Sequence, residues 1–341
     1  MKINLKYIFL LLLPFVPVLK ITAQDGSNPY TFLNITPSAR IYGLGGVNIS
    51  TVEDNIATTD QNPALLGPEM SNHIGITYMR YFGDSNFASL NYAHSAGENG
   101  AWQASMRYFG YGSMKATDET GGYIGDFSPK DVCFAGGYTR DLSAMVRAGF
   151  NFKMIYSSYE QYSAFALATD LGINYYNEEK DLSLSAVIAN LGGQVKRFDQ
   201  TYDRLPVDVR LGWSQSFGTL PIRFSVTAWN LTKWKLPYYE TSDGTSESTP
   251  TLKEDFTSNL FRHLVFGADF TPSDRFFISL GYNYKVKTDM ATYSRSILSG
   301  FSIAAGLNVK NFDVSVAFAQ PHPSATTFMV SLGLNLNDLL H

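Results

Sequence analysis

The residue types that usually carry catalysis or bind metals are few in this sequence, and they are scattered along it. No histidine has a carboxylate residue or the cysteine at metal-ligand spacing. The histidines are His73, His94, His263, His322 and His341. The single cysteine, Cys133, lies between Val132 and Phe134, which favours a small buried filler over a nucleophile. We therefore predict no catalytic, metal or cofactor site and no enzyme activity.

One glycine-rich run, Gly43-Leu44-Gly45-Gly46, superficially resembles a phosphate-binding loop. A phosphate loop follows a strand and ends in Lys-Ser or Lys-Thr, and neither feature is present here. Glycine is also the residue that best tolerates a positive φ angle. The run is therefore better interpreted as a tight turn.

The composition is rich in aromatic residues and poor in charge. Aromatic residues make up 14% of the chain, with 21 tyrosines, and charged residues 16%. Soluble domains carry roughly 25% charged residues, whereas membrane barrels confine charge to loops and lumen and collect Tyr and Trp at the interfaces. The single cysteine excludes an intrachain disulfide. The net charge of −4 argues against a nucleic-acid partner.

The beginning of the chain has the pattern of a secretory signal peptide, residues 1–23. Lys2 and Lys6 precede an apolar run from Ile8 to Leu19, and Ile21-Thr22-Ala23 has the character of a cleavage site. The apolar run is too short for a typical spanning helix. We expect export from the cytoplasm, with an uncleaved anchor helix as the alternative.

Apolar and polar residues alternate with period two through most of the chain, which is typical of strands that have one apolar and one polar face. From 144 to 156 every even position is apolar, and from 312 to 318 the even positions are Phe or Val. We predict that Phe150, Phe152, Val316 and Phe318 face lipid, and that Arg147, Asn151 and Lys153 face the lumen. About fourteen such segments occur: 73–80, 86–95, 101–112, 130–139, 144–156, 162–176, 181–190, 206–217, 222–233, 261–270, 275–286, 301–309, 312–319 and 326–336.

The connections between these segments alternate in length. Every second one is short, whereas the others include the long polar stretches 113–129, 191–205, 235–260 and 287–300. Outer-membrane barrels have short turns at one end and longer loops at the other, and a soluble sandwich has no reason to follow this rule. The loops 81–85 and 157–161 are short exceptions. We predict an all-β, about 14-stranded antiparallel transmembrane outer-membrane β-barrel over residues 73–341.

Residues 24–72 do not follow the strand pattern. They are rich in Gly, Pro, Asn and Asp, and an irregular stretch of this length is unusual for a loop. We expect an N-terminal hatch that plugs the lumen, with a disordered tail as the alternative. The acids Glu53, Asp54 and Asp60 are expected to meet basic lumen residues, unless they lie exposed in a turn. The basic candidates are Arg107, Arg147, Arg210 and Arg223.

Two runs in this region resemble the N-terminal hatch of the FadL-like barrels. They are PSARIYGLGGVNIST, Pro37 to Thr51, followed by Glu53-Asp54, and NPALLG, Asn62 to Gly67. The hatch residues implied by the resemblance are Pro37, Gly43, Gly45, Gly46, Glu53, Asp54, Asn62 and Pro63. Within that superfamily the sequence is most similar to the PorQ family of the type IX secretion system of Bacteroidetes.

This resemblance implies a scaffold in the outer membrane of a Gram-negative bacterium of the Bacteroidetes type. Its partners would be the lipid bilayer and lipopolysaccharide, and a PorZ-like surface protein that it anchors. The sortase PorU and the shuttle barrel PorV would belong to the same attachment complex, which processes cargo proteins and joins them to lipopolysaccharide.

Two alternatives stay open: a FadL-like channel for uptake of hydrophobic small molecules, and a soluble periplasmic or surface β-protein. The polar loop 240–250 and the small polar residues expected in the lumen favour a plugged scaffold. Partner-binding candidates in or beside the longest loop, Lys235 to Leu260, are Trp234, Tyr238 and Tyr239, because aromatic residues often anchor interfaces. The same residues are equally typical of a girdle at the lipid headgroups.

Overall fold

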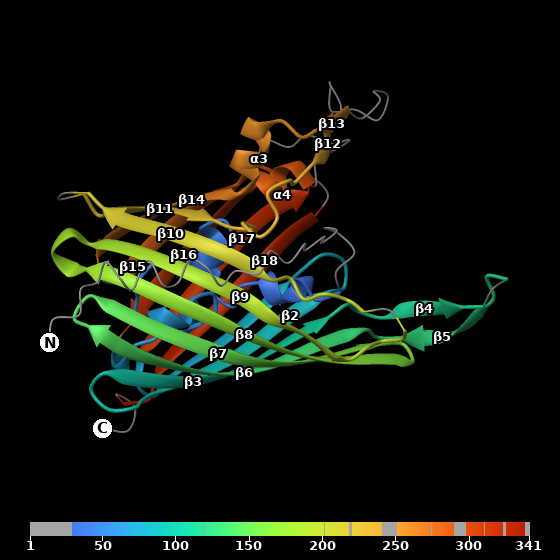
Figure 1. Ribbon diagram of the computed structural model, residues 1–341, viewed down its shortest axis with the longest axis horizontal. Helices are drawn as coiled ribbons and strands as arrows, with labels where there is room; N and C mark the ends of the chain where they lie inside the picture. Colours follow the sequence, from blue (N-terminus) through green and yellow to red (C-terminus); the bar gives the residue numbers. More distant parts are fainter. Residues whose placement is uncertain are drawn as a thin grey trace, which may run out of the picture.

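The computed structural model shows a closed antiparallel barrel of fourteen strands, in which the first strand pairs with the last (Figure 1). It describes residues 29–118, 120–200, 202–217, 220–240, 251–273, 275–289, 298–309, 311–322 and 325–337. The barrel strands are β1 (His73–Arg80), β2 (Asn86–Ser95), β3 (Gly100–Gly110), β6 (Lys130–Ser143), β7 (Val146–Tyr159), β8 (Tyr162–Asn177), β9 (Leu182–Lys196), β10 (Asp208–Ser216), β11 (Ile222–Ala228), β14 (Leu264–Ser273), β15 (Phe276–Asn283), β16 (Phe301–Val309), β17 (Phe312–His322) and β18 (Ala325–Asn335).

The two faces of the barrel follow the alternation in the sequence. In β7, Phe150 and Phe152 are exposed on the outside, whereas Asn151 and Lys153 are buried inside. In β17, Val316 and Phe318 are likewise exposed, as predicted. Arg147 also points inward, where it forms an ion pair with Glu69 of the N-terminal region. The predicted register is therefore confirmed.

Several strand ends differ from the prediction. β11 ends at Ala228 and not at 233, because Asn230 adopts a left-handed conformation with φ of 55°. β15 ends at Asn283, and the next residues form helix α4 (Tyr284–Asp289). β9 continues to Lys196, beyond the predicted end at 190. Alternation alone does not detect such ends, since the same residue types continue past them.

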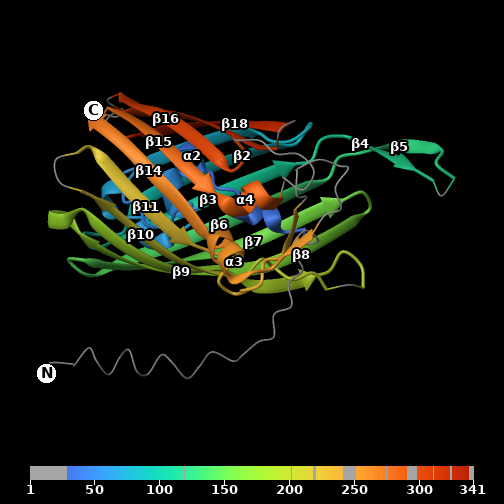
Figure 2. The ribbon, with the colours of Figure 1, turned by 90° about the horizontal axis from the view of Figure 1, so that it is seen from above.

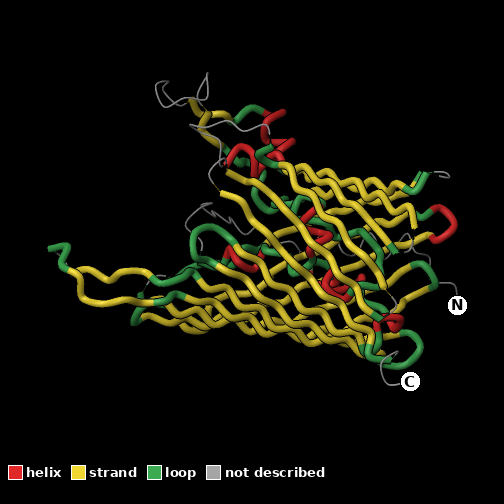
Figure 3. Tube along the Cα trace, turned by 180° about the vertical axis from the view of Figure 1, so that it is seen from behind, coloured by secondary structure: helices red, strands yellow, loops and turns green. Residues whose placement is uncertain are grey.

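The long connections all lie at one end of the barrel and the connections at the other end are all short, as the sequence predicts, although the short loops 81–85 and 160–161 share the end of the long ones (Figures 1 and 3). We call these the long-loop end and the short-turn end. Two loops at the long-loop end contain hairpins of their own that the strand pattern does not predict. These hairpins are β4 (Met114–Thr117) with β5 (Tyr123–Phe127), and β12 (Tyr238–Glu240) with β13 (Thr251–Lys253), the latter followed by α3 (Phe256–Arg262).

Residues 29–72, here called the inner segment, consist of short helical turns that contact inward-facing residues of the strands (Figure 2). The turns are η1 (Thr31–Asn34), α2 (Ala39–Gly43), η2 (Ile56–Asp60), η3 (Pro63–Leu65) and η4 (Pro68–Met70). The side chains of Ser38, Asn55 and Asn62 accept hydrogen bonds at the N-termini of α2, η2 and η3. Asn and Ser are preferred at this position because they satisfy a backbone N–H that has no helical partner.

The signal peptide expected at residues 1–23 lies outside the described residues. Within the described part, every helix is too short or too polar to span a bilayer.

The exposed apolar face generates a first prediction. Val316→Arg should lower the free energy of unfolding by roughly 2–4 kcal/mol in lipid, because it places a charge on the lipid side near the middle of a strand. Val316→Leu is the matched control and should change it by less than about 1.5 kcal/mol. Urea titration in lipid vesicles, followed by gel mobility, measures both. Equal stability of the two variants would contradict the assigned face.

Candidate functional site

The inner segment contacts the barrel wall most closely at glycines. A Cβ atom at Gly281 of β15 would lie 2.1 Å from the backbone nitrogen of Gly45, and one at Gly172 of β8 would lie 2.2 Å from Oδ1 of Asn62. Any larger residue at these strand positions would push the segment off the wall. Gly45 and Gly46 have φ angles of 97° and 82°, so the glycine-rich run is the tight turn that the sequence predicts.

The other expected hatch residues also contact the wall. The carbonyl oxygen of Pro37 accepts a hydrogen bond from the hydroxyl of Thr77, and that of Gly43 accepts one from Ser302. The side chain of Asn62 donates to the hydroxyl of Ser185 in β9 over 3.2 Å. Pro63 packs beside Gly149. Residues far apart in the sequence are thus joined by direct polar contacts.

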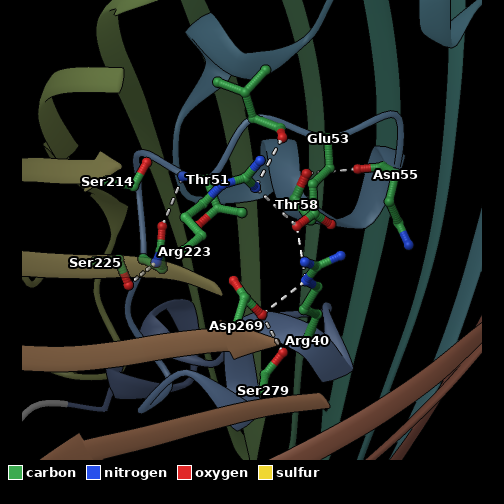
Figure 4. A network of polar contacts seen from close by, with 12 residues as sticks. Arg40, Thr51, Glu53, Asn55, Thr58, Ser214, Arg223, Ser225, Asp269 and Ser279 are labelled. Carbon is green, nitrogen blue, oxygen red and sulfur yellow. Dashed lines mark hydrogen bonds and ion pairs between the residues drawn. The ribbon is translucent and has the colours of Figure 1, made fainter. Parts of the chain in front are cut away.

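Arg40, whose role no pattern in the sequence indicates, lies at the centre of one polar cluster (Figure 4). Its Nε atom lies 2.8 Å from Oε1 of Glu53 and 3.1 Å from Oδ1 of Asp269. Its guanidinium lies 4.1 Å from the ring centroid of Phe277. The hydroxyl of Ser279 donates to the carboxylate of Asp269. One cation is therefore shared by an acid of the inner segment and an acid of β14.

Glu53 also faces Arg223, whose Nη1 lies 4.0 Å from its Oε1, as predicted (Figure 4). Arg223 is itself paired with Asp181, which lies in the turn before β9, over 3.3 Å. Burial raises the pKa of the Glu53 carboxyl to about 7, although Arg40 and Arg223 act in the opposite direction. Glu53 therefore binds a proton more readily in the native protein than in the unfolded chain.

A second pair links the inner segment to β3. Asp60 accepts from Nη2 of Arg107 over 2.5 Å, and only 1% of Arg107 is exposed. Arg107 also donates to the carbonyl of Leu33 over 3.2 Å. Charges buried to this extent are retained only when they are paired. Arg107 therefore holds two separate parts of the inner segment, at Leu33 and at Asp60, against the wall.

Three sequence-based expectations about charge were wrong. Asp54 is exposed and meets none of these basic residues; its backbone carbonyl oxygen lies 3.1 Å from Nδ1 of His73. Arg210 pairs with Asp208 of its own strand over 2.7 Å. Arg147 pairs with Glu69 of the inner segment and with none of the three expected acids.

The lumen is not lined by small polar residues alone, contrary to expectation. Near the long-loop end, β1, β2, β3, β7 and β18 turn large apolar side chains inward. They are Met79, Phe87, Phe109, Ile155 and Met329, and they pack in one cluster with Tyr30, Phe32 and Leu33 of the inner segment. We call this cluster the apolar layer. Cys133 belongs to it, which agrees with the predicted role as a buried filler.

A row of aromatic rings continues the apolar layer along the long-loop end. Ring centroids lie 4.7 Å apart for Phe109 and Tyr111, 5.7 Å for Tyr111 and Tyr159, and 4.9 Å for Tyr159 and Phe198. The row ends at Tyr30, 6.4 Å from Phe198. Contacts of this length are typical of favourable aromatic pairs. The first residues of the inner segment are thus held by apolar and aromatic surface.

The three aromatic candidates for partner binding lie in different environments. Trp234 and Tyr239 are exposed, and Trp234 stacks on His263 with ring centroids 5.1 Å apart. Tyr238 is only 8% exposed, because the guanidinium of Arg262 covers it. The guanidinium carbon lies 4.9 Å from the centroid of the Tyr238 ring. Tyr238 therefore offers little surface to a partner. The polar loop expected at 240–250 lies, apart from Glu240, outside the described residues.

Comparisons with known proteins identify the fold. No family model matches the sequence, and no curated protein matches it significantly. Among solved structures, the chain is similar to the Ralstonia pickettii toluene transporter TbuX, with a TM-score of 0.54 and 11% identity, covering 88% of this chain and 98% of that one. It is also similar to a mutant of the monoaromatic hydrocarbon channel TodX, with a TM-score of 0.55 and 11% identity over 87% and 98%. A third similar structure is a Pseudomonas aeruginosa FadL homologue, with a TM-score of 0.50 and 11% identity, covering 88% of this chain and 98% of that one. The chain therefore has the fold of the 14-strand FadL-like outer-membrane barrels.

The buried pair of Asp60 and Arg107 generates a second prediction. Asp60→Asn should destabilise the protein by roughly 3–5 kcal/mol, because it leaves the buried guanidinium uncompensated. Asp54→Asn changes an exposed acid of the same segment and should have an effect within about 0.5 kcal/mol. Unfolding in urea measures both variants. An Asp60→Asn protein as stable as the Asp54→Asn control would show that this pair does not hold the segment.

The raised pKa of Glu53 generates a third prediction. Between its unfolded value of 4.5 and about 7, the native state binds more protons at Glu53 than the unfolded state does. The contribution of Glu53 to stability should therefore decrease as pH rises through this window. The difference in melting temperature, Glu53→Gln minus wild type, should therefore be larger at pH 8 than at pH 4.5. A constant difference between the two proteins would contradict the assignment.

Proposed function

We propose that the protein lies in the outer membrane of a Gram-negative bacterium and takes up hydrophobic small molecules. The observation that carries this proposal is the apolar layer, since a lumen that only needed to be blocked could be filled by polar groups. Inward-facing Phe87, Phe109 and Met329 give an apolar solute a favourable environment near the long-loop end. The fold supports the proposal, because structures with the same fold include a toluene transporter and a hydrocarbon channel.

In this function the inner segment serves as the hatch. Tyr30, Phe32 and Leu33 occupy the apolar layer, so an entering solute takes their place against the same side chains. Exchange of one apolar contact for another costs little free energy. The ion pairs of Arg40 and Arg107 hold the rest of the hatch in the lumen and oppose the passage of ions.

A second candidate is a PorQ-like scaffold of the type IX secretion system that anchors a PorZ-like surface protein, together with PorU and PorV. The observation that favours it is the β4–β5 hairpin, which extends from the barrel at the long-loop end (Figures 1 and 2). It exposes the large apolar residues Tyr123 and Ile124. Exposed apolar side chains on a projecting arm are suited to contact with another protein.

The channel proposal generates a fourth prediction. Met329→Gln should reduce uptake of toluene several-fold, because it places a side chain with unpaired polar groups in the apolar layer. Met154 is an exposed methionine on the outer face of the barrel, so Met154→Gln is the matched control and should leave uptake unchanged. Uptake of labelled toluene by cells that express each variant is the measurement.

A strain that lacks the protein separates the two candidate functions. Loss of toluene uptake with normal surface attachment of cargo supports the channel. Normal uptake together with lost retention of a surface partner would overturn the channel and favour the scaffold.

A further inference from the structure

Asp131 of β6 differs from the other buried aspartates of the lumen in having no basic partner among the described residues. Asp60, Asp170, Asp208 and Asp269 are also buried, and each lies 2.5–3.1 Å from an arginine or lysine nitrogen. Asp131 is 0% exposed, and the polar groups around its carboxylate are hydroxyls. Buried carboxylates are normally paired with a cation. The negative charge of Asp131 is therefore available to a cation from outside the chain.

Two tyrosine hydroxyls take the place of a cation beside Asp131. Tyr111 donates to Oδ2 over 2.6 Å, and the hydroxyl of Tyr159 lies 3.0 Å from both carboxylate oxygens. The hydroxyl of Tyr159 is also 3.3 Å from the carbonyl of Pro29, and it has only one proton to share between these acceptors. The hydroxyls thus fix the position of the carboxylate but do not neutralise its charge.

Aromatic rings lie next to this carboxylate. Phe109 is directly opposite Asp131 in the pairing of β3 with β6. The planes of Tyr111 and Tyr159 are 78° apart, whereas Tyr159 and Phe198 are stacked with planes 20° apart. The ring faces are therefore turned in two directions. A group of aromatic faces beside a carboxylate is suited to an organic cation, because each ring face attracts positive charge.

Tyr30 of the inner segment fills the end of this site. Its ring stacks on Phe198 with centroids 6.4 Å apart, and its hydroxyl accepts a hydrogen bond from Gln194 over 2.8 Å. Burial raises the pKa of Tyr30 to about 12, and the negative charges of Asp203 and Asp131 act in the same direction. The position of Tyr30 thus combines aromatic surface with the negative potential of two acids. A group that replaces Tyr30 there is favoured if it carries a positive charge.

We propose that the position of Tyr30 binds hydrophobic ammonium compounds, with the positive charge between Asp131 and the aromatic rings and the apolar part in the apolar layer. This inference rests on the proposed uptake function, because the solute must displace Tyr30. A quaternary ammonium group spreads its charge over methyl groups and needs no hydrogen-bond acceptor. It can therefore lie against the ring faces while Asp131 keeps its bonds to the two hydroxyls. A neutral solute gains only the apolar contacts.

Binding of benzyltrimethylammonium and of its neutral isostere neopentylbenzene tests the proposal. Each labelled compound is dialysed to equilibrium against the protein in lipid nanodiscs, with empty nanodiscs as the blank. Asp131→Asn removes the charge but keeps the shape and a hydrogen-bond acceptor. It should weaken binding of the ammonium compound by roughly tenfold or more and leave binding of neopentylbenzene unchanged within about twofold. Asp126→Asn is the matched control, because Asp126 is an exposed acid of β5 at the same end, and it should change neither.

The results separate this inference from the function on which it rests. Binding of neopentylbenzene alone to the wild type overturns the inference but agrees with uptake of hydrophobic solutes, whereas binding of neither compound overturns both. An Asp131→Asn variant that binds the ammonium compound as wild type does, or loses both compounds equally, also overturns the inference.

A second variant applies if Asp131→Asn loses heat-modifiable gel mobility and so does not fold. Phe198→Leu keeps an apolar side chain at a half-buried position but removes a ring face. It should weaken binding of the ammonium compound several-fold more than binding of neopentylbenzene. An equal effect on the two compounds would show that the rings provide apolar surface only, and would overturn the cation site.

Discussion

Closure of the hydrogen-bond ladder is the constraint on which the rest of this structure depends. A backbone group without a partner costs several kcal/mol in hydrocarbon, so a sheet in a membrane must have no open edge at that depth. Here β1 pairs along its whole length with β18 on one side and β2 on the other. Closure in turn fixes which residues face outward and encloses a lumen that must be filled.

The filling of the lumen combines two kinds of interaction. Apolar packing at the long-loop end is non-directional and tolerates exchange of one apolar group for another. The ion pairs of Arg40 and Arg107 are directional, and a shift of the segment by one residue would leave buried charges unpaired. The charged contacts therefore specify one position of the inner segment, whereas the apolar contacts allow its first residues to be replaced. This division fits the proposed uptake function, in which the first residues give way to an apolar solute and the rest of the segment stays in place.

The sequence predicts the faces of the strands well, because a period of two depends only on nearest neighbours. The tight turn at Gly45 and Gly46 is predicted for a similarly local reason. The role of Arg40 could not be predicted, since its partner Asp269 is 229 residues away and the segment around it has no periodicity. The apolar layer is not evident from the sequence, because inward-facing residues such as Phe87 and Phe109 interrupt an otherwise polar face only near one end of each strand. The extension of β9 past residue 190 is likewise not indicated by any local pattern.

The path of the inner segment has a consequence for how the protein is assembled. Pro29 accepts a hydrogen bond from Tyr159 at the long-loop end, whereas Ser71 contacts Ser95 at the short-turn end, so the segment threads the full depth of the ring. A ring that had already closed would have to admit this chain end-on. If the β1–β18 pairing forms last, the nascent sheet can instead wrap around the segment and seal it inside. The order of closure thus decides whether the inner segment ends up inside the lumen or is left outside a barrel that has already closed.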